Sequence, residues 1–114
     1  MLVTGNGGLG IIIIGEGTRV LNSNVSFNVY DGITCTVWCH VEGNTVIENG
    51  QMGADMGTGT LLGNTIAHNG SYGANGNNLG YGNNTIADNN EGGTQTDGTF
   101  IKLFPNACYP TACP

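Results

Sequence analysis

The sequence predicts an all-β solenoid, a single-stranded parallel β-helix of about five coils, and three observations favour this fold class. The first is a unit of eight residues that returns after 20 residues, at 43–50, 63–70 and 83–90, with upstream copies shifted by 21 and 22. Helical solenoids need longer units. About 20 residues accommodate two extended segments and two turns, so each repeat should form one coil.

The second observation is a column of β-branched residues that recurs in register. Its members are Val3, Val25, Val46, Ile66 and Ile86. β-Branched residues favour strands, so the column should form one inward stack along the solenoid axis. The alternative is a flexible low-complexity coil, which would not keep a periodic hydrophobe.

The third observation is an asparagine three residues after each of these aliphatic residues. The column comprises Asn6, Asn28, Asn49, Asn69 and Asn89. Asn tolerates the left-handed backbone of a sharp turn, and its amide can bond to the equivalent Asn one coil away. We therefore expect a structural asparagine ladder.

A glycine column follows four residues after the asparagines, where the chain starts its next strand. It comprises Gly10, Gly32, Gly53, Gly73 and Gly93. The next column shrinks and turns polar, in the order Ile11, Ile33, Ala54, Ala74 and Thr94. The core should therefore be better packed at its N-terminal end.

The two ends of the solenoid differ. Residues 1–104 should form the β-helix, and residues 105–114, rich in Pro and Cys, should cap its last coil together with Phe100 and Phe104. The N-terminal coil has no such cap, although Ile11–Ile14 is apolar on both faces of its strand. We expect upstream coils or the end of another copy to cover it, and the second arrangement can propagate as a filament.

Composition excludes several partners. The net charge is −6, and Arg19 and Lys102 are the only cationic side chains apart from two His. Binding of nucleic acid needs a basic patch, and anionic membranes and polyuronides are disfavoured for the same reason. Ile11–Ile14 is too short to cross a bilayer, so no membrane insertion is expected. No signal peptide opens the chain, as in a mature form or a piece of a longer β-helix.

The cysteines form two close pairs, Cys35 with Cys39 and Cys108 with Cys113. Four cysteines allow three pairings, and we favour local bridges; Cys35 can reach Cys39 only if the chain turns between them. A metal site is the weaker alternative, because the spacing matches no zinc pattern. We expect no metal or cofactor. Disulfides with an uncharged polar surface indicate an extracellular or cell-surface location.

The segment Thr34–Val41 contains the single tryptophan, Trp38. Together with His40 it could form a platform on which a sugar stacks. Structurally, a Trp at one coil can instead be a lid over a corner of the solenoid. The candidate glycan contacts are Trp38, Tyr72 and Tyr81.

The Gly-Asn-Thr-(Val/Ile)-x-x-Asn-Gly units resemble the right-handed parallel β-helix repeat family, the pectate-lyase-like superfamily. More closely, they resemble secreted bacterial β-helix proteins rich in Gly and Asn that have no assigned enzyme activity. The resemblance covers residues 3 to about 93. It implies a right-handed β-helix, but that fold hosts lyases, hydrolases, adhesins and structural shafts.

The motifs of the enzymatic branches are missing, since the chain has no adjacent Asp pair, no Gly-His-Gly and no Arg-Ile-Lys. Glu48, His68 and Asp88 share one column, which could do acid–base work or hold a cation. A variable column beside the ladder is the simpler interpretation, and we assign no catalytic residue. Ice binding is a further alternative, from an aligned row of Thr45, Thr65 and Thr85 that Asn24 interrupts.

The sequence therefore predicts a non-catalytic extracellular structural β-helix that associates end to end with copies of itself through its uncapped N-terminal coil, as a rod, a filament or a component of a surface layer. The alternative is a carbohydrate-binding protein, either an adhesin or a truncated β-helix of the polysaccharide lyase or hydrolase type.

Overall fold

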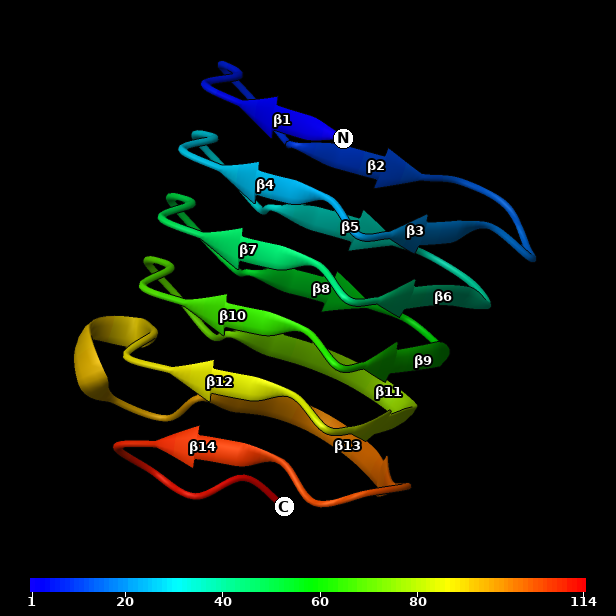
Figure 1. Ribbon diagram of the computed structural model, residues 1–114, viewed down its shortest axis with the longest axis vertical. Helices are drawn as coiled ribbons and strands as arrows, with labels where there is room; N and C mark the ends of the chain where they lie inside the picture. The colour runs from blue at the N-terminus through cyan, green and yellow to red at the C-terminus, as the bar shows by residue number, and fades with distance from the viewer.

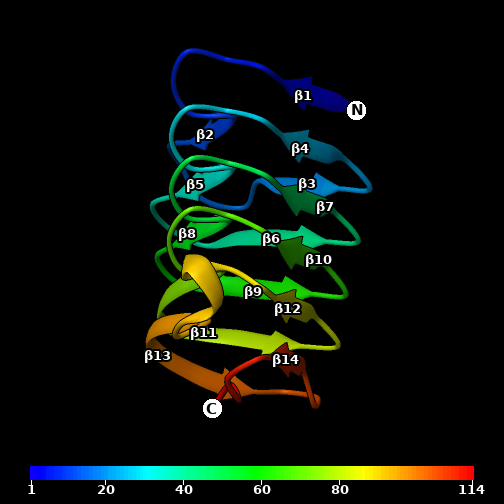
Figure 2. The same cartoon turned by 90° about the vertical axis from the view of Figure 1, so that its left-hand side faces the viewer.

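A computed structural model describes residues 1–114 and confirms a right-handed parallel β-helix of about five coils (Figures 1 and 2). Its elements, in chain order, are β1 (Leu2–Thr4), β2 (Ile11–Ile13), β3 (Arg19–Leu21), β4 (Asn24–Ser26), β5 (Ile33–Cys35), β6 (Cys39–Glu42), β7 (Thr45–Ile47), β8 (Ala54–Met56), β9 (Gly59–Leu62), β10 (Thr65–Ala67), β11 (Ala74–Gly82), β12 (Thr85–Ala87), the 3-10 turn η1 (Asn90–Gly92), β13 (Thr96–Lys102) and β14 (Ala107–Tyr109). None of these elements is a helix with the length and apolar character needed to span a bilayer.

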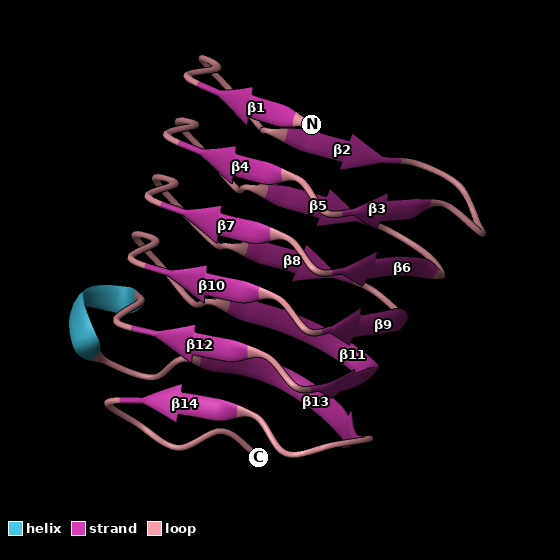
Figure 3. Ribbon diagram, viewed as in Figure 1, coloured by secondary structure: helices cyan, strands magenta, loops and turns pink.

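Each coil has three faces, one more than the two extended segments expected from the repeat length. The first face stacks β1, β4, β7, β10, β12 and β14. The second stacks β2, β5 and β8, and the third stacks β3, β6 and β9 (Figure 3). In the fourth and fifth coils one long strand covers both of the latter faces, since β11 pairs with β8 at its start and with β9 at its end. Strands of three or four residues make the third face possible within 20 residues.

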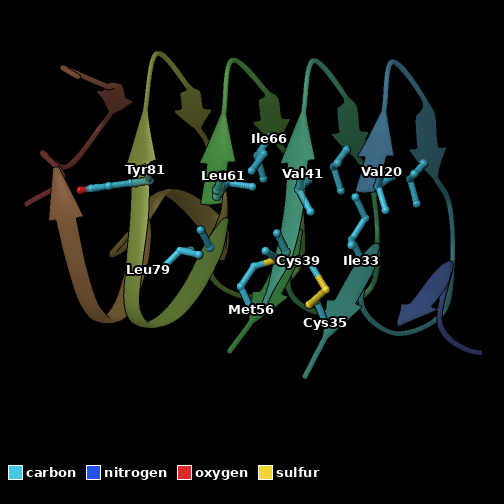
Figure 4. Close-up of a cluster of buried hydrophobic side chains, with 14 of the residues drawn as sticks. Val20, Ile33, Cys35, Cys39, Val41, Met56, Leu61, Ile66, Leu79 and Tyr81 are labelled. Carbon is cyan, nitrogen blue, oxygen red and sulfur yellow. A yellow bond between two sulfur atoms is a disulfide. The ribbon is translucent and has the colours of Figure 1, made fainter. Parts of the chain in front are cut away.

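The predicted aliphatic column is confirmed on the first face. Val3, Val25, Val46, Ile66 and Ile86 are successive partners in register, and Cys108 continues the column in β14. A second column on the third face comprises Val20, Val41, Leu61 and Tyr81 (Figure 4). Ile33, Ala54 and Ala74 form the inward column of the second face. Full burial of each large aliphatic side chain contributes about 1.5–3 kcal/mol, so these columns are the core.

The asparagine ladder is also confirmed, at the corner between the first and second faces. From Asn6 to Asn89, each Nδ2 donates to the Oδ1 of the Asn one coil later over 2.8–3.0 Å. The expected left-handed backbone at these asparagines is wrong. It belongs to the preceding residues, Phe27, Glu48, His68 and Asp88, whose φ angles lie between 53° and 56°.

A second ladder, which the sequence analysis missed, occupies the corner between the third and first faces. Each Nδ2 donates a hydrogen bond of 2.9–3.1 Å to the Oδ1 of the next member, in the order Asn44, Asn64, Asn84 and Asn106. The ladder begins at Ser23, whose backbone N–H donates to the Asn44 Oδ1 over 2.9 Å. Both corners are thus fixed by buried amides, which rigidify the path of the chain.

The glycine column is required because a side chain at these positions would clash with the next coil. A Cβ on Gly53 would lie 2.3 Å from the Ile66 Cγ2 and 2.8 Å from the Asn69 Nδ2, and Gly10, Gly32 and Gly73 are equally confined by the next coil. Gly93 was predicted as the fifth member of the glycine column and Thr94 as the fifth member of the column after it. Both predictions are wrong, because η1 lengthens this coil by two residues. In register, Gln95 follows Gly73, and Thr96 pairs with Ala74.

The C-terminal residues 105–114 combine a partial sixth coil with a crossing tail. β14 adds one strand to the first face, and a disulfide then joins Cys108 to Cys113, which packs against the core. The Tyr81 hydroxyl donates to the backbone oxygen of Pro114. The tail therefore lies across the end of the fifth coil (Figure 1).

Candidate functional site

Trp38 lies on the turn between β5 and β6, at the corner between the second and third faces. Cys35 and Cys39 form a disulfide across this turn, as predicted, and both are buried (Figure 4). Trp38 itself has a φ of 49°, and its side chain is 61% exposed. The tryptophan is therefore presented to solvent, so it is not a lid over the corner.

A hollow of about 320 Å³ opens beside Trp38. Its lining comes from three successive coils and comprises Gly17, Thr18, Arg19, Trp38, Cys39, His40, Gly59 and Thr60. The space arises because glycines lie one coil before and one coil after the Trp38 turn. Gly17 lies one coil before Trp38, and its N–H donates to the Trp38 carbonyl over 3.0 Å. Gly59 pairs with Cys39, and a Cβ there would lie 2.1 Å from the Cys39 oxygen.

Polar side chains line one side of the hollow, in a single column of the third face. Arg19 pairs in register with His40, which pairs with Thr60. The His40 Nε2 lies 2.8 Å from a Glu42 carboxylate oxygen, and its Nδ1 bonds to the Thr60 hydroxyl. Both ring nitrogens are thus engaged and fix the imidazole, whereas the exposed Arg19 forms no ion pair.

The other two candidate glycan contacts lie elsewhere. Tyr72 is half-buried in the turn between β10 and β11, outside the hollow. Tyr81 as a glycan contact is wrong, because its side chain points into the core and stacks on Phe100 with ring centroids 4.5 Å apart. Burial raises the pKa of the Tyr81 phenol, and the nearby Asn106 side chain acts in the opposite direction.

Thr18, Arg19 and Thr60 also line the hollow and were not among the candidates predicted from the sequence. One signal was available, the period itself: Arg19 stands 21 residues before His40, and Thr60 stands 20 after it. Counting the repeat in both directions from His40 leads to Arg19 and Thr60, and Thr18 adjoins Arg19.

The N-terminal end has a second hollow, of about 520 Å³. Its lining comprises Met1, Ile11, Ile12, Ile13, Thr18, Arg19, Val20, Leu21 and Ser23. Nothing within the chain covers the outer face of β2 and the residue that follows it, since Ile12 is 55% and Ile14 82% exposed. The strands β1, β2 and β3 each pair on one side only, so three backbone edges are open at the level of one coil.

The two remaining candidate columns, one acidic with a histidine and one of threonines, lie on the surface of the solenoid. Glu48, His68 and Asp88 are solvent-exposed at the corner after the first face, all in the left-handed conformation. Thr45, Thr65 and Thr85 pair in register along β7, β10 and β12. The first row gathers into no cluster of metal-ligating side chains.

Comparisons with known proteins bear on the fold. No family model matches the chain, and no curated protein matches it. Among solved structures, the chain is similar to the crystal structure of the periplasmic alginate epimerase AlgG, with a TM-score of 0.77 and 22% sequence identity over 90% of this chain. The chain spans 26% of the length of that protein. By this likeness and by its own coils, the chain has a right-handed parallel β-helix fold.

Proposed function

We propose that this protein is a non-catalytic extracellular structural β-helix that associates with copies of itself through its N-terminal coil. The open N-terminal end carries the proposal. The two disulfides support an oxidising location outside the cytosol.

The first support is the state of the strand edges. β1, β2 and β3 present unpaired N–H and C=O groups on one side. Natural sheets protect such edges, because an open edge is a template for another strand. Three edges at one level form a flat end that another such end can meet.

The second support is the apolar surface at this end. Ile12 and Ile14 are exposed beside the 520 Å³ hollow, in which six of the nine lining residues are hydrophobic. Removing an exposed aliphatic side chain from water contributes about 1.5–3 kcal/mol. A partner that covers this end therefore gains both hydrogen bonds and hydrophobic burial.

The partner that fits best is the same end of a second copy. At the C-terminal end the sixth coil has only β14, and the tail with Cys113 lies where the other two faces would continue. Stacking an N-terminal coil there would leave β2 and β3 without strands to pair. Two N-terminal ends related by a two-fold axis can meet on all three faces, which gives a closed rod of two copies.

The test is the solution mass of the wild type and two matched variants, measured by sedimentation equilibrium. Ile12 and Ile101 are 55% and 54% exposed, at opposite ends of the solenoid. We expect a dimer for the wild type and for Ile101→Asp. We expect Ile12→Asp to weaken the dimer on the order of 100-fold, because two carboxylates would be buried without partners.

A wild type that stays monomeric at every concentration overturns the self-association. Loss of association in both variants, or growth of the wild type into filaments, would point to joining of unlike ends and overturn the closed pair. Circular dichroism of each variant confirms that the fold is intact.

A further inference from the structure

We propose that the hollow beside Trp38 is a carbohydrate site that holds one pyranose residue of an uncharged polysaccharide, with the indole as its stacking surface. The site lies on the third face and its corner, and it shares Thr18 and Arg19 with the hollow at the N-terminal end.

The first step is the way in which the turn presents Trp38 to solvent. Its left-handed backbone is shared by other corner residues of the solenoid, such as Phe27 and Glu48, so the exposure of the indole and the space beside it carry the argument. Here the Cys35–Cys39 disulfide holds the turn, and the indole is 61% exposed.

The second step is the room around the indole. The lining of the hollow includes Gly17 from the coil before Trp38 and Gly59 from the coil after it, and neither of these residues has a side chain to fill the space beside the indole. The hollow of about 320 Å³ is comparable to the small end of ligand sites. A single sugar ring fits this space better than an extended peptide or a second domain.

The third step is the chemistry of the lining. A pyranose has an apolar C–H face, which stacks on an aromatic ring, and a rim of hydroxyls, which need donors and acceptors. Arg19 offers unpaired guanidinium donors, and Thr18 offers an exposed hydroxyl. His40 is fixed by Glu42 and Thr60, so the polar side of the site is preorganised.

The fourth step is charge, which selects the class of sugar. Arg19 is the one cationic side chain in the lining, and two acidic residues lie next to lining residues: Glu42, 2.8 Å from the His40 ring, and Glu16, which adjoins Gly17 in the sequence. The whole chain carries a net charge of −6. An anionic polysaccharide would be repelled by this field, whereas a neutral one would not.

The test uses the intrinsic fluorescence of the wild-type chain, because Trp38 is its only tryptophan. The probes are cellohexaose and maltohexaose as neutral ligands, and a hexamer of galacturonate as the anionic one. We expect at least one neutral hexamer to give a saturable change in emission, and the galacturonate hexamer to bind at least about tenfold more weakly. No response to either neutral hexamer overturns the site, and equal or tighter binding of the anionic hexamer overturns the assigned class.

Matched glycine variants then separate binding from folding, with affinities measured by calorimetry. Trp38→Gly and Phe27→Gly both remove an exposed aromatic side chain from a left-handed position, with φ angles of 49° and 55° and exposures of 61% and 63%. Glycine suits this backbone, so neither variant should melt below the wild type. We expect Trp38→Gly to lose at least about tenfold in affinity and Phe27→Gly to keep it; equal effects would overturn the stacking role. Neither variant touches the N-terminal end, so the mass of the wild type tests the proposed function separately.

Discussion

At the scale of the residue, two consecutive residues form each corner of the solenoid, and each has a different role. The first residue adopts the left-handed backbone and the second, an Asn, holds the corner through its amide. Asn49 shows how complete this is: its Oδ1 accepts from the backbone N–H and the Nδ2 of Asn28, and its Nδ2 donates to Asn69 and to the Val25 carbonyl. Because these bonds fix the corner, the strained position before the Asn tolerates side chains as different as Phe27 and Glu48.

The first prediction follows from this arrangement. Asn49→Ala should lower the free energy of unfolding by about 3–5 kcal/mol, because it leaves several buried donors and acceptors without partners. Asn77→Ala, at an exposed position without a side-chain hydrogen bond, should change it by less than about 0.5 kcal/mol. Urea unfolding of both variants measures the difference, and equal small effects would contradict a stabilising ladder.

The asparagine ladder could be predicted from the sequence, but the left-handed position before each Asn could not. The identity of Asn at a fixed spacing was enough to predict the ladder. The strained position was not predictable, because its residue type varies from coil to coil and Asn is itself the common choice for a left-handed turn. The second ladder was missed although Asn44, Asn64 and Asn84 keep the spacing, since Ser23 ends the column one coil earlier.

At the scale of the element, the C-terminal coils show how a repeat is closed. η1 inserts residues after Asn89, and Gln95 then reaches back so that its Oε1 accepts from the Asn89 Nδ2 over 2.9 Å. The longer side chain replaces the next ladder Asn and ends the column. The tail closes the neighbouring faces through Cys113 and the bond from Tyr81 to Pro114.

The second prediction concerns this tail. Below pH 9, Tyr81→Phe should lower the free energy of unfolding by about 1 kcal/mol, the usual value of a lost hydrogen bond. Burial raises the pKa of Tyr81 above its ordinary value of 10.0, so the protonated phenol stabilises the folded chain. This contribution is complete below pH 10 and is lost as the pH rises through the folded pKa.

Urea unfolding from pH 7 to 11 tests whether the free energy of unfolding falls as Tyr81 loses its proton. The wild type should lose stability above pH 10 more steeply than Tyr81→Phe, while Tyr109→Phe, at a 65% exposed position, should follow the wild type. Parallel curves for all three proteins would contradict the buried contact.

Element boundaries explain the errors of register in the sequence analysis. A glycine stood four residues after Asn89 as in every other coil, so Gly93 matched the column, but the two extra residues of η1 move the true partner to Gln95. In a chain with 21 Gly, the residue type alone does not reveal an insertion. The assignment of Tyr81 to a glycan failed for a different reason: its register with Leu61 and Val41 was not followed, and that register places it in the core.

At the scale of the whole molecule, the solenoid is asymmetric along its axis. The C-terminal end is crossed by a disulfide-linked tail, and the N-terminal end is open, with three free strand edges and exposed Ile12 and Ile14. The repeat predicted the coils because each coil obeys the same local rules. The Trp38 hollow was only partly predictable, because its residues come from three coils and its space comes from glycines that carry no signal of their own.

Hydrogen exchange of the first coil tests the central claim, that a second copy covers the open N-terminal end. In the wild type, the outward-facing amides of β1, β2 and β3 should exchange slowly, because each edge is paired across the two-fold axis. In Ile12→Asp the same amides should exchange fast, while residues 45–87 stay protected in both proteins. Equally fast exchange of residues 1–21 in the wild type and the variant would contradict the account.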